Sequence, residues 1–398
     1  MSTTELTTKL CRSAENELAK KIASSVSVPK VIPIYMSSVF SFDDVPTLDS
    51  VYDGSRNGYV YGRMANPGLD AVEEVMAAAE GSDASVVFSA GMAAIITTIM
   101  ANVSSGDHII SSPVLYGGVY DYFANELPRW GVTVDFVDFD HDDIEKYIRP
   151  NTKVVYTETI ANPLMEATDL RKAATIAHKH GCKLIVDNTF ATPVVCQPLK
   201  LGADIVVYSA TKFLGGHSDI VGGAVCSDKK NIADIQKKAT LYGDLMSPFD
   251  AFLLTRSLRT LELRVRQHSE NALKVAQYME QHPKIDKVYY PGLESSPSHT
   301  IAMSQFNNGL CGGMVSADIA GGAEKAEEFI ANCKYIKFVP SLASFSSMLS
   351  YPVKTSHRAY PPEELKKCGI SAAMIRFSIG IESADDIISD IDQALAKL

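Results

Sequence analysis

The sequence has no long apolar run. Among its 398 residues, no stretch approaches the ~20 consecutive apolar residues that a membrane-spanning helix needs. The first residues, Met1 to Glu5, also lack the apolar core of a secretory signal peptide. We therefore expect a cytoplasmic protein with no membrane as partner.

Basic residues are outnumbered by acidic ones. The chain carries 37 Lys and Arg against 47 Asp and Glu, which gives a formal net charge of −10 and a pI near 5.4. Phosphate backbones and anionic lipid surfaces attract basic proteins, so this balance argues against nucleic acid or an anionic membrane as partner. The net charge does not indicate which small molecule is the substrate.

The cysteines form no CxxC pair. There are seven of them, scattered along the chain as Cys11, Cys182, Cys196, Cys226, Cys311, Cys333 and Cys368. A disulfide framework or a structural zinc site needs paired or clustered ligands. The spacing therefore favours reduced thiols in a cytoplasm, and we expect no metal site.

Apolar residues are plentiful, at 46% of the chain, which is ample for a sizeable core. Because the length exceeds that of one ordinary domain, we expect two domains preceded by an arm. Strand and helix patterns alternate through residue 226, which predicts an α/β fold with a mostly parallel sheet and helices on both faces. The predicted boundaries are 1–58 for the arm, 59–250 for a large domain and 251–398 for a C-terminal domain.

The sequence also predicts a helix in the arm and a helical connection between the two domains. A short helix from roughly Leu10 to Ser25 fits the composition of the arm, whereas the prolines at 29, 33 and 46 break up the remainder of the arm. A long helical stretch from Pro248 to about Gln281 connects the large domain to the C-terminal one. We expect its arginines to lie on a solvated or interface face, namely Arg256, Arg259, Arg264 and Arg266.

A single lysine follows an apolar run of strand length. The run from Ile205 ends at Ser209, and Lys212 then stands just before two glycines. Apolar neighbours strip hydration from an amine and lower its pKa, so that it can attack a carbonyl. The hydroxyls of Ser209 and Thr211 are placed to hold an anion beside it. This pattern is that of an anchor for pyridoxal phosphate (PLP), although a surface lysine after a core strand is the ordinary alternative.

A second apolar strand, 183–187, ends in the carboxylate of Asp187. Functional groups collect at the carboxyl ends of parallel strands, which would bring Asp187 and Lys212 into one crevice. PLP needs an acid that keeps its pyridine nitrogen protonated, as well as a lysine for its aldehyde. An N-cap or turn role for Asp187 is the alternative.

The strand 84–88 leads through small residues into a helix. Free backbone N–H groups at such a helix start, with its positive end, form an anion site. Beside Lys212, we interpret Gly91 and Met92 as backbone donors to the PLP phosphate. Close strand–helix packing that merely needs small residues is the alternative.

Three motifs together resemble a known family. The segments 187–189, 209–212 and 215–219 are similar to those of the Cys/Met-metabolism family of PLP-dependent enzymes, and matching segments run from about Tyr59 to the C-terminus. The family includes methionine γ-lyase, cystathionine γ-lyase, cystathionine β-lyase and cystathionine γ-synthase. The resemblance implies a fold type I enzyme, with a mostly parallel sheet in the large domain, a smaller α+β C-terminal domain, and homotetramers built from dimers.

The resemblance also implies roles for residues around the cofactor. Tyr61 and Arg63 reach across a dimer interface to the PLP phosphate of the partner subunit. Tyr116 covers the PLP ring and assists proton transfer to the leaving group. Asn162 hydrogen-bonds the ring hydroxyl of PLP, and Glu158 supports the same side of the cofactor site.

On the substrate side, the resemblance assigns Arg376 to the α-carboxylate of an amino acid, with help from Ser341 and Tyr61. A structural salt bridge is the alternative for Arg376, since a charge inside an apolar strand rarely lacks a partner. Two departures stand out. Gly118 replaces a cysteine that methionine γ-lyases often carry, and Ser346 replaces a Glu found in several relatives that handle cystathionine.

The resulting functional prediction is elimination of the γ-substituent of a sulfur-containing or other γ-substituted amino acid, giving a 2-oxo acid and ammonia. Lys212 serves as the base, with Asp187 and Tyr116 as the other catalytic residues. Replacement at Cγ of an O-acylhomoserine, or β-elimination from cystathionine, would use the same residues. A non-enzymatic binder of PLP or an amino acid need not keep both a base and an electron-sink partner, so the intact set argues against that class.

Overall fold

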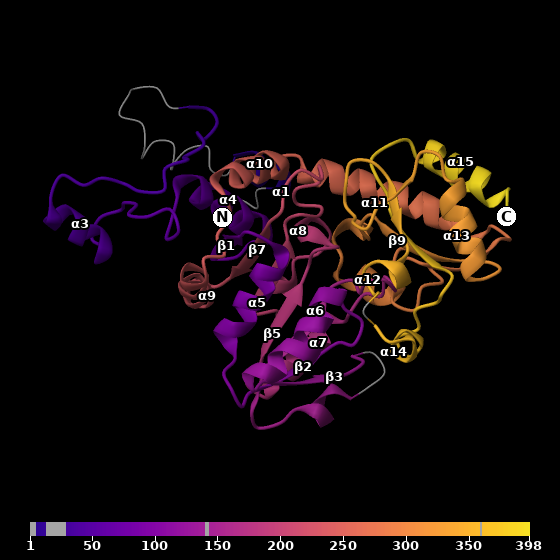
Figure 1. Cartoon of the computed structure of the whole chain (residues 1–398), viewed down its shortest axis with the longest axis horizontal. Helices are drawn as coiled ribbons and strands as arrows, with labels where there is room; N and C mark the ends of the chain where they lie inside the picture. The colour runs from indigo at the N-terminus through magenta and orange to yellow at the C-terminus, as the bar shows by residue number, and fades with distance from the viewer. Residues whose placement is uncertain (1–4, 13–28, 140–142, 359) are drawn as a thin grey trace.

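The computed structural model describes residues 5–12, 29–139, 143–358 and 360–398. Its body contains two β-sheets joined by long helices (Figure 1). The seven strands of the larger sheet are β1 (Ala84–Phe88), β2 (His108–Ser111), β3 (Thr133–Phe136), β4 (Thr152–Glu158), β5 (Lys183–Asp187), β6 (Ile205–Ser209) and β7 (Gly223–Ser227). Their order is β1-β7-β6-β5-β4-β2-β3, and only the pairings of β7 with β1 and β6 are antiparallel. The predicted mostly parallel α/β sheet is confirmed.

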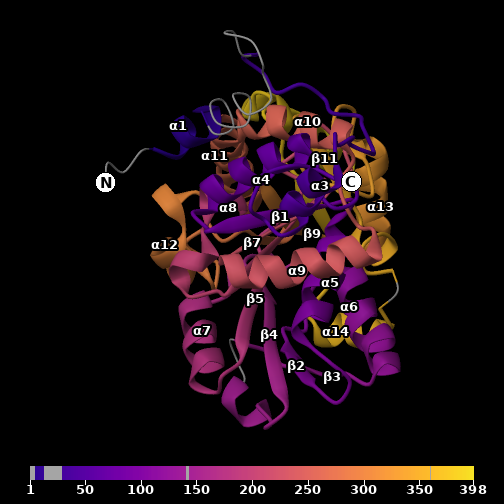
Figure 2. The same cartoon turned by 90° about the vertical axis from the view of Figure 1, so that its left-hand side faces the viewer.

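Both faces of this sheet are buried, which explains the continuous apolar runs of its strands. Alternate residues of β6 face opposite sides: Val206 packs into one core cluster and Val207 into the other. One face is covered by α4 (Pro67–Glu80), α7 (Leu170–Lys179), α8 (Thr192–Val195) and α10 (Pro248–Leu258). The other is covered by α5 (Gly91–Asn102), α6 (Gly117–Asp121) and α9 (Lys229–Tyr242), with α9 lying across the sheet beside α5 (Figure 2).

The smaller sheet has the strand order β10-β11-β12-β9-β8. Its strands are β8 (Ile285–Tyr289), β9 (Met314–Ile319), β10 (Lys337–Phe338), β11 (Met348–Ser350) and β12 (Met374–Ser378). The helices around it are α11 (Leu261–Glu280), α12 (His299–Gln305), α13 (Ala323–Asn332), α14 (Pro362–Lys367) and α15 (Ala384–Leu395). Short helical turns complete the chain at Tyr122–Glu126, Leu127–Trp130, Ile144–Tyr147, Pro198–Leu201, Asn307–Gly309 and Pro352–Lys354.

The connector between the sheets consists of two helices, α10 and α11, which are separated at Arg259 and Thr260. The expectation of a solvated or interface position is wrong for Arg264, which is buried. Its guanidinium donates to the carbonyl oxygens of Phe213 at 2.8 Å and Ser257 at 2.9 Å. Burial is tolerated because backbone acceptors satisfy the planar donor fork without a carboxylate.

The N-terminal arm contains α1 (Leu6–Arg12) and α3 (Val45–Tyr52). Most of the helix expected from Leu10 to Ser25 lies outside the described residues. The expectation that proline breaks up the rest of the arm is wrong for α3, because Pro46 occupies its first turn, where no N–H is needed. The Asp44 side chain caps this helix by accepting from the Thr47 N–H at 2.7 Å. None of its residues is buried, and α3 projects from the body (Figure 1).

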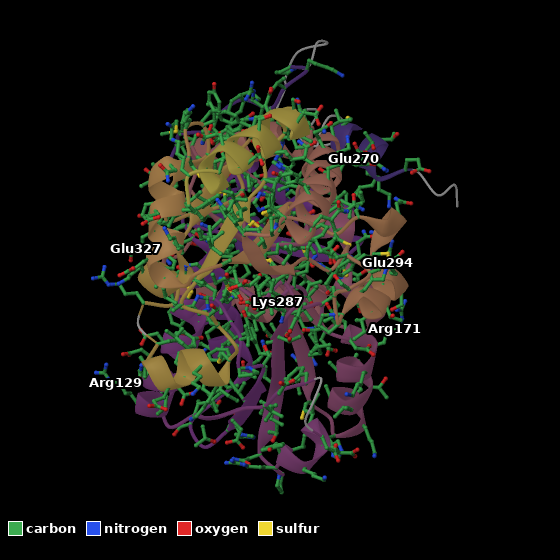
Figure 3. All side chains as sticks on the ribbon, turned by 90° about the vertical axis from the view of Figure 1, so that its right-hand side faces the viewer. Arg129, Arg171, Glu270, Lys287, Glu294 and Glu327 are labelled. Carbon is green, nitrogen blue, oxygen red and sulfur yellow. The ribbon has the colours of Figure 1, made fainter. Side chains whose placement is uncertain are left out.

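Charged side chains such as Arg171, Glu270, Lys287 and Glu327 are exposed on the outer surface of the body (Figure 3). Within the described ranges, no helix combines the length and apolar character needed to cross a bilayer. The boundaries at residues 58 and 250 remain predictions.

A buried carboxyl in α4 generates a prediction about stability. Glu80 is fully buried and accepts from the hydroxyl of Tyr208 in β6. Burial raises the pKa of Glu80 from 4.5 to about 8. Because the folded chain holds this proton more tightly than the unfolded chain, the group's contribution to stability is complete below about pH 4.5 and is lost as the pH rises to about 8.

Glu80→Gln removes the need for this proton, so its midpoint of thermal unfolding should fall less than that of the natural chain between about pH 5 and pH 8. Glu74→Gln, at an exposed position of the same helix, is the matched control. Calorimetry across this pH range measures both. Parallel pH profiles for the natural chain and Glu80→Gln would contradict a protonated Glu80.

Candidate active site

A cavity of about 400 Å³ lies at the carboxyl ends of β4, β5 and β6, and segments that flank the smaller sheet close it. Eleven of the thirteen predicted site residues line it: Gly91, Met92, Tyr116, Glu158, Asn162, Asp187, Ser209, Thr211, Lys212, Ser341 and Arg376. The crevice predicted at the strand ends is therefore present, and it is completed by residues far along the chain.

Lys212 lies in the tight turn that follows β6. The turn is held by backbone bonds, including Lys212 N–H to the Ser209 carbonyl at 3.1 Å. The Lys212 Nζ donates to Ser341 Oγ at 3.1 Å. Burial, followed by the positive charge of Arg376, lowers the pKa of Lys212 to about 8. The lowered pKa increases the unprotonated fraction of this amine near neutral pH, and the unprotonated form is the one that attacks a carbonyl.

Asp187 ends β5, directly beside β6. Its carboxylate is buried and accepts from the Thr189 N–H at 2.9 Å. Burial raises the pKa of Asp187 to about 6, against the lowering effect of the Thr189 hydrogen bonds. A cationic N–H placed against this carboxylate would stabilise its charged form and would be held there.

The start of α5 lies at the cavity, where an anion site was predicted. Amides in the first turn of a helix have no intrahelical acceptor, so those of Gly91 and Met92 are available to a ligand. Gly91 packs so closely on β6 that a Cβ would lie 2.7 Å from the Ser209 Cβ. The Thr211 hydroxyl is bonded to Gly222, donating to its carbonyl at 3.2 Å. The small residues thus allow close packing, and the anion role of this turn stays a prediction.

Tyr116 stands at the mouth of the cavity with 46% of its surface exposed. Its N–H donates to Glu158 Oε1 at 2.7 Å, so the residue that ends β4 fixes the backbone of Tyr116. Gly118 lies under the Tyr116 ring, where a Cβ would come within 2.8 Å of ring carbon Cε1. The departure at Gly118 therefore leaves room for this ring position.

Arg376 is buried in β12. Its Nη1 donates to Asn162 Oδ1 at 2.7 Å, and its Nη2 lies 3.4 Å from the Ser341 carbonyl oxygen. Its Nε has no acceptor among the described residues, and no carboxylate among them lies within ion-pair distance. A structural salt bridge therefore does not account for this charge, which is free to bind an anion.

Tyr61 and Arg63 lie outside the cavity. Tyr61 is 42% exposed, and the Arg63 guanidinium lies over its ring, 5.5 Å from the centroid. Arg63 also donates to the carbonyl oxygen of Thr240 at the end of α9. The described chain does not bring these two residues into its own site.

Several lining residues were not predicted as site residues. Thr189 belongs to the quoted motif after Asp187, and its hydroxyl accepts from the Ser209 N–H at 2.8 Å. Its place two residues after Asp187 was the available signal. The other unpredicted residues include Phe190, Val221, Thr355 and Ser356. They lie in loops, and no local pattern marks them.

These groups fit PLP. The cavity provides an amine with a lowered pKa for the aldehyde, a buried carboxylate for the pyridine nitrogen, and helix-start amides with the Ser209 hydroxyl for the phosphate. Arg376, whose Nε has no partner among the described residues, offers a separate donor for an anion.

Comparison with known proteins agrees with this chemistry. Residues 15–396 match the family described as Cys/Met metabolism PLP-dependent enzyme. The chain is 40% identical to an L-methionine gamma-lyase of Porphyromonas gingivalis over 92% of both chains, and 42% identical to a cystathionine gamma-lyase of Bacillus subtilis over 92% of this chain and 94% of the relative. The crystal structure of a cystathionine gamma-lyase from Lactobacillus plantarum complexed with L-serine superposes with a TM-score of 0.90, at 35% identity over 99% of both chains. The chain belongs to the Cys/Met-metabolism family of PLP-dependent enzymes.

Proposed function

We propose that the protein is a PLP-dependent carbon–sulfur lyase that removes the γ-substituent of a sulfur-containing amino acid, giving a 2-oxo acid and ammonia. The observation that supports this most directly is the partly buried Lys212 amine, which shares its cavity with Asp187 and Arg376 and donates to Ser341. Bound PLP supplies an electron sink that stabilises negative charge on the substrate carbons next to the amino group.

Substrate orientation is the task of Arg376. Asn162 and the Ser341 carbonyl hold the guanidinium from one side, so that its remaining donors can grip an α-carboxylate. A fixed carboxylate places the substrate Cα within reach of Lys212, which hydrogen-bonds the neighbouring Ser341 side chain. Such positioning supplies a large share of the rate in enzymes of this kind.

Proton transfer is divided between two side chains. The Lys212 Nζ, with its pKa lowered to about 8, would take the proton from Cα, pass it to the bound cofactor and, as a free amine again, take a proton from Cβ. Tyr116, at the mouth of the same cavity, donates its hydroxyl proton to the sulfur that leaves Cγ. Water completes the reaction and gives equimolar thiol, ammonia and 2-oxo acid.

The uncharged part of the cavity wall favours an apolar leaving group. Leu342 and Val221 belong to this wall, and Ser346 is not among the lining residues. Four charged residues line the cavity, and each has a role toward the cofactor or the α-carboxylate: Glu158, Asp187, Lys212 and Arg376. A thioether such as that of methionine therefore fits better than the second charged end of cystathionine, because burying a charge without a partner is costly.

A complete site would need two chains. Tyr61 and Arg63 are exposed on a face that also presents Met36, Val39 and Leu241. Apolar exposure of this kind is typical of a protein–protein interface. In a dimer built on this face, Tyr61 and Arg63 would reach the phosphate and the substrate in the partner's cavity. Pairing of such dimers gives the homotetramer that we propose, acting in the cytoplasm.

The reaction is tested by supplying purified enzyme with methionine, homocysteine, cystathionine, cysteine and O-acylhomoserines. We expect methionine to give 2-oxobutyrate, methanethiol and ammonia in equal amounts, and Lys212→Ala to give none. Product analysis by chromatography measures all three. Pyruvate from cystathionine as the main product would identify a β-lyase instead, and condensation products alone would identify a γ-replacement enzyme.

Sharing of sites between subunits is tested by co-expressing two inactive variants, Arg63→Ala and Lys212→Ala, with different affinity tags. A mixed dimer would place both changes in one site and leave the other intact, so dimers purified through both tags should recover about half of the natural activity per dimer. Each variant purified alone serves as the control. Failure of the mixed dimers to recover activity would mean that Arg63 serves its own chain.

A further inference from the structure

A buried histidine joins the two walls of the cavity without lining it. His357 follows the short turn Pro352–Lys354, next to the lining residues Thr355 and Ser356. It is fully buried, and its Nε2 lies 3.1 Å from the carbonyl oxygen of Leu115. Leu115 directly precedes Tyr116, so His357 connects a loop beside the small sheet to the backbone that carries Tyr116.

The hydrogen bonds of His357 determine its tautomer. Burial, followed by the charge of Arg376, lowers the pKa of His357 to about 4, so the ring is neutral and carries one N–H. A carbonyl oxygen can only accept, which places the hydrogen on Nε2. Nδ1 is then an acceptor, and the Ser356 hydroxyl donates to it at 2.9 Å. One ring therefore holds Leu115 on one side and Ser356 on the other, and the backbone of Asn162 is a further hydrogen-bond partner.

The contact between the Tyr116 loop and the Thr355–Ser356 loop is tightly packed around this histidine. A Cβ on Gly117 would lie 2.0 Å from the Ser356 carbonyl oxygen, so the two backbones touch. The His357 ring packs on the Tyr360 ring with 4.9 Å between ring centroids, and the Tyr360 ring packs on that of Tyr120 in α6 with 4.2 Å between centroids. Tyr116 is thus positioned from two directions, by Glu158 through its N–H and by His357 through the preceding carbonyl.

We propose that His357 is a positioning residue. Its Nε2–H bond to Leu115 orients Tyr116 for proton donation to the leaving group and fixes the position of Tyr116 relative to Thr355 and Ser356. The role assigned to Tyr116 rests on the proposed function, whereas the restraint on the 113–120 backbone does not. Loss of this bond leaves Tyr116 present but misaligned, which should slow the step in which sulfur departs more than it weakens substrate binding.

Two substitutions separate the two bonds of the ring. The amide nitrogen of His357→Gln reaches about as far as Nε2 and keeps the bond to Leu115, whereas the shorter His357→Asn can replace only Nδ1. We expect His357→Asn to lower kcat tenfold or more with KM changed less than about threefold, and His357→Gln to retain most of kcat. Adding Tyr116→Phe to His357→Asn should cost little beyond the larger single effect, since both act through one group.

Hydrogen exchange followed by mass spectrometry on segment 113–120 is the readout that needs no substrate. His357→Asn should speed exchange in this segment, whose amides include the Tyr116 N–H held by Glu158, while His357→Gln should not. The control is His108→Asn, a fully buried histidine at the opposite end of β2 that bonds Thr152 at 2.8 Å. Equal behaviour of His357→Asn and His357→Gln, or equal exchange in His108→Asn, would overturn the proposal. Kinetics are measured on whichever substrate the natural enzyme converts, so a different reaction would not be mistaken for failure of the His357 bond.

Discussion

The contact between the Lys212 amine and Ser341, beside Arg376, is the interaction on which the site depends. It joins the end of a parallel strand in one sheet to a wall beside the other sheet. Taken separately, each side buries a positive charge at a cost in hydration. Together they enclose a cavity in which one charge has a lowered pKa and the other remains free for an anion. The connector helices make this possible, since Arg264 of α11 fastens the turn after Lys212 through backbone carbonyls.

Buried polar groups around the cavity are mostly held by backbone and neutral side chains. Glu158 accepts from Tyr116, Asp187 accepts from Thr189, and Asn162 accepts from Arg376. These hydrogen bonds fix each side chain without a close ion pair, which suits groups that must respond to a charged ligand. The protein therefore fixes the positions of these side chains, and the cofactor and substrate would supply the opposite charges when they bind.

The sequence predicts the large sheet and the strand-end residues well, because buried parallel strands have continuous apolar runs and their carboxyl ends share an edge. Lys212 and Asp187 follow from that logic. Arg376 and Ser341 follow only from family resemblance, since no local pattern connects β12 with β6, which lies far earlier in the chain. Loop residues such as Thr355 and Ser356 were missed because no local pattern marks them. Arg264 was misplaced because the backbone carbonyls that accept from a buried arginine cannot be recognised in the sequence.

The central claim is that the Lys212 amine carries the cofactor through a carbon–nitrogen bond opposite Asp187. Reduction of the PLP-loaded enzyme with borohydride makes such a bond permanent, and peptide mass spectrometry then locates it. We predict one pyridoxyl phosphate group per chain, on the peptide that contains Lys212. A label on a different lysine, with the peptide of Lys212 unmodified, would contradict this claim.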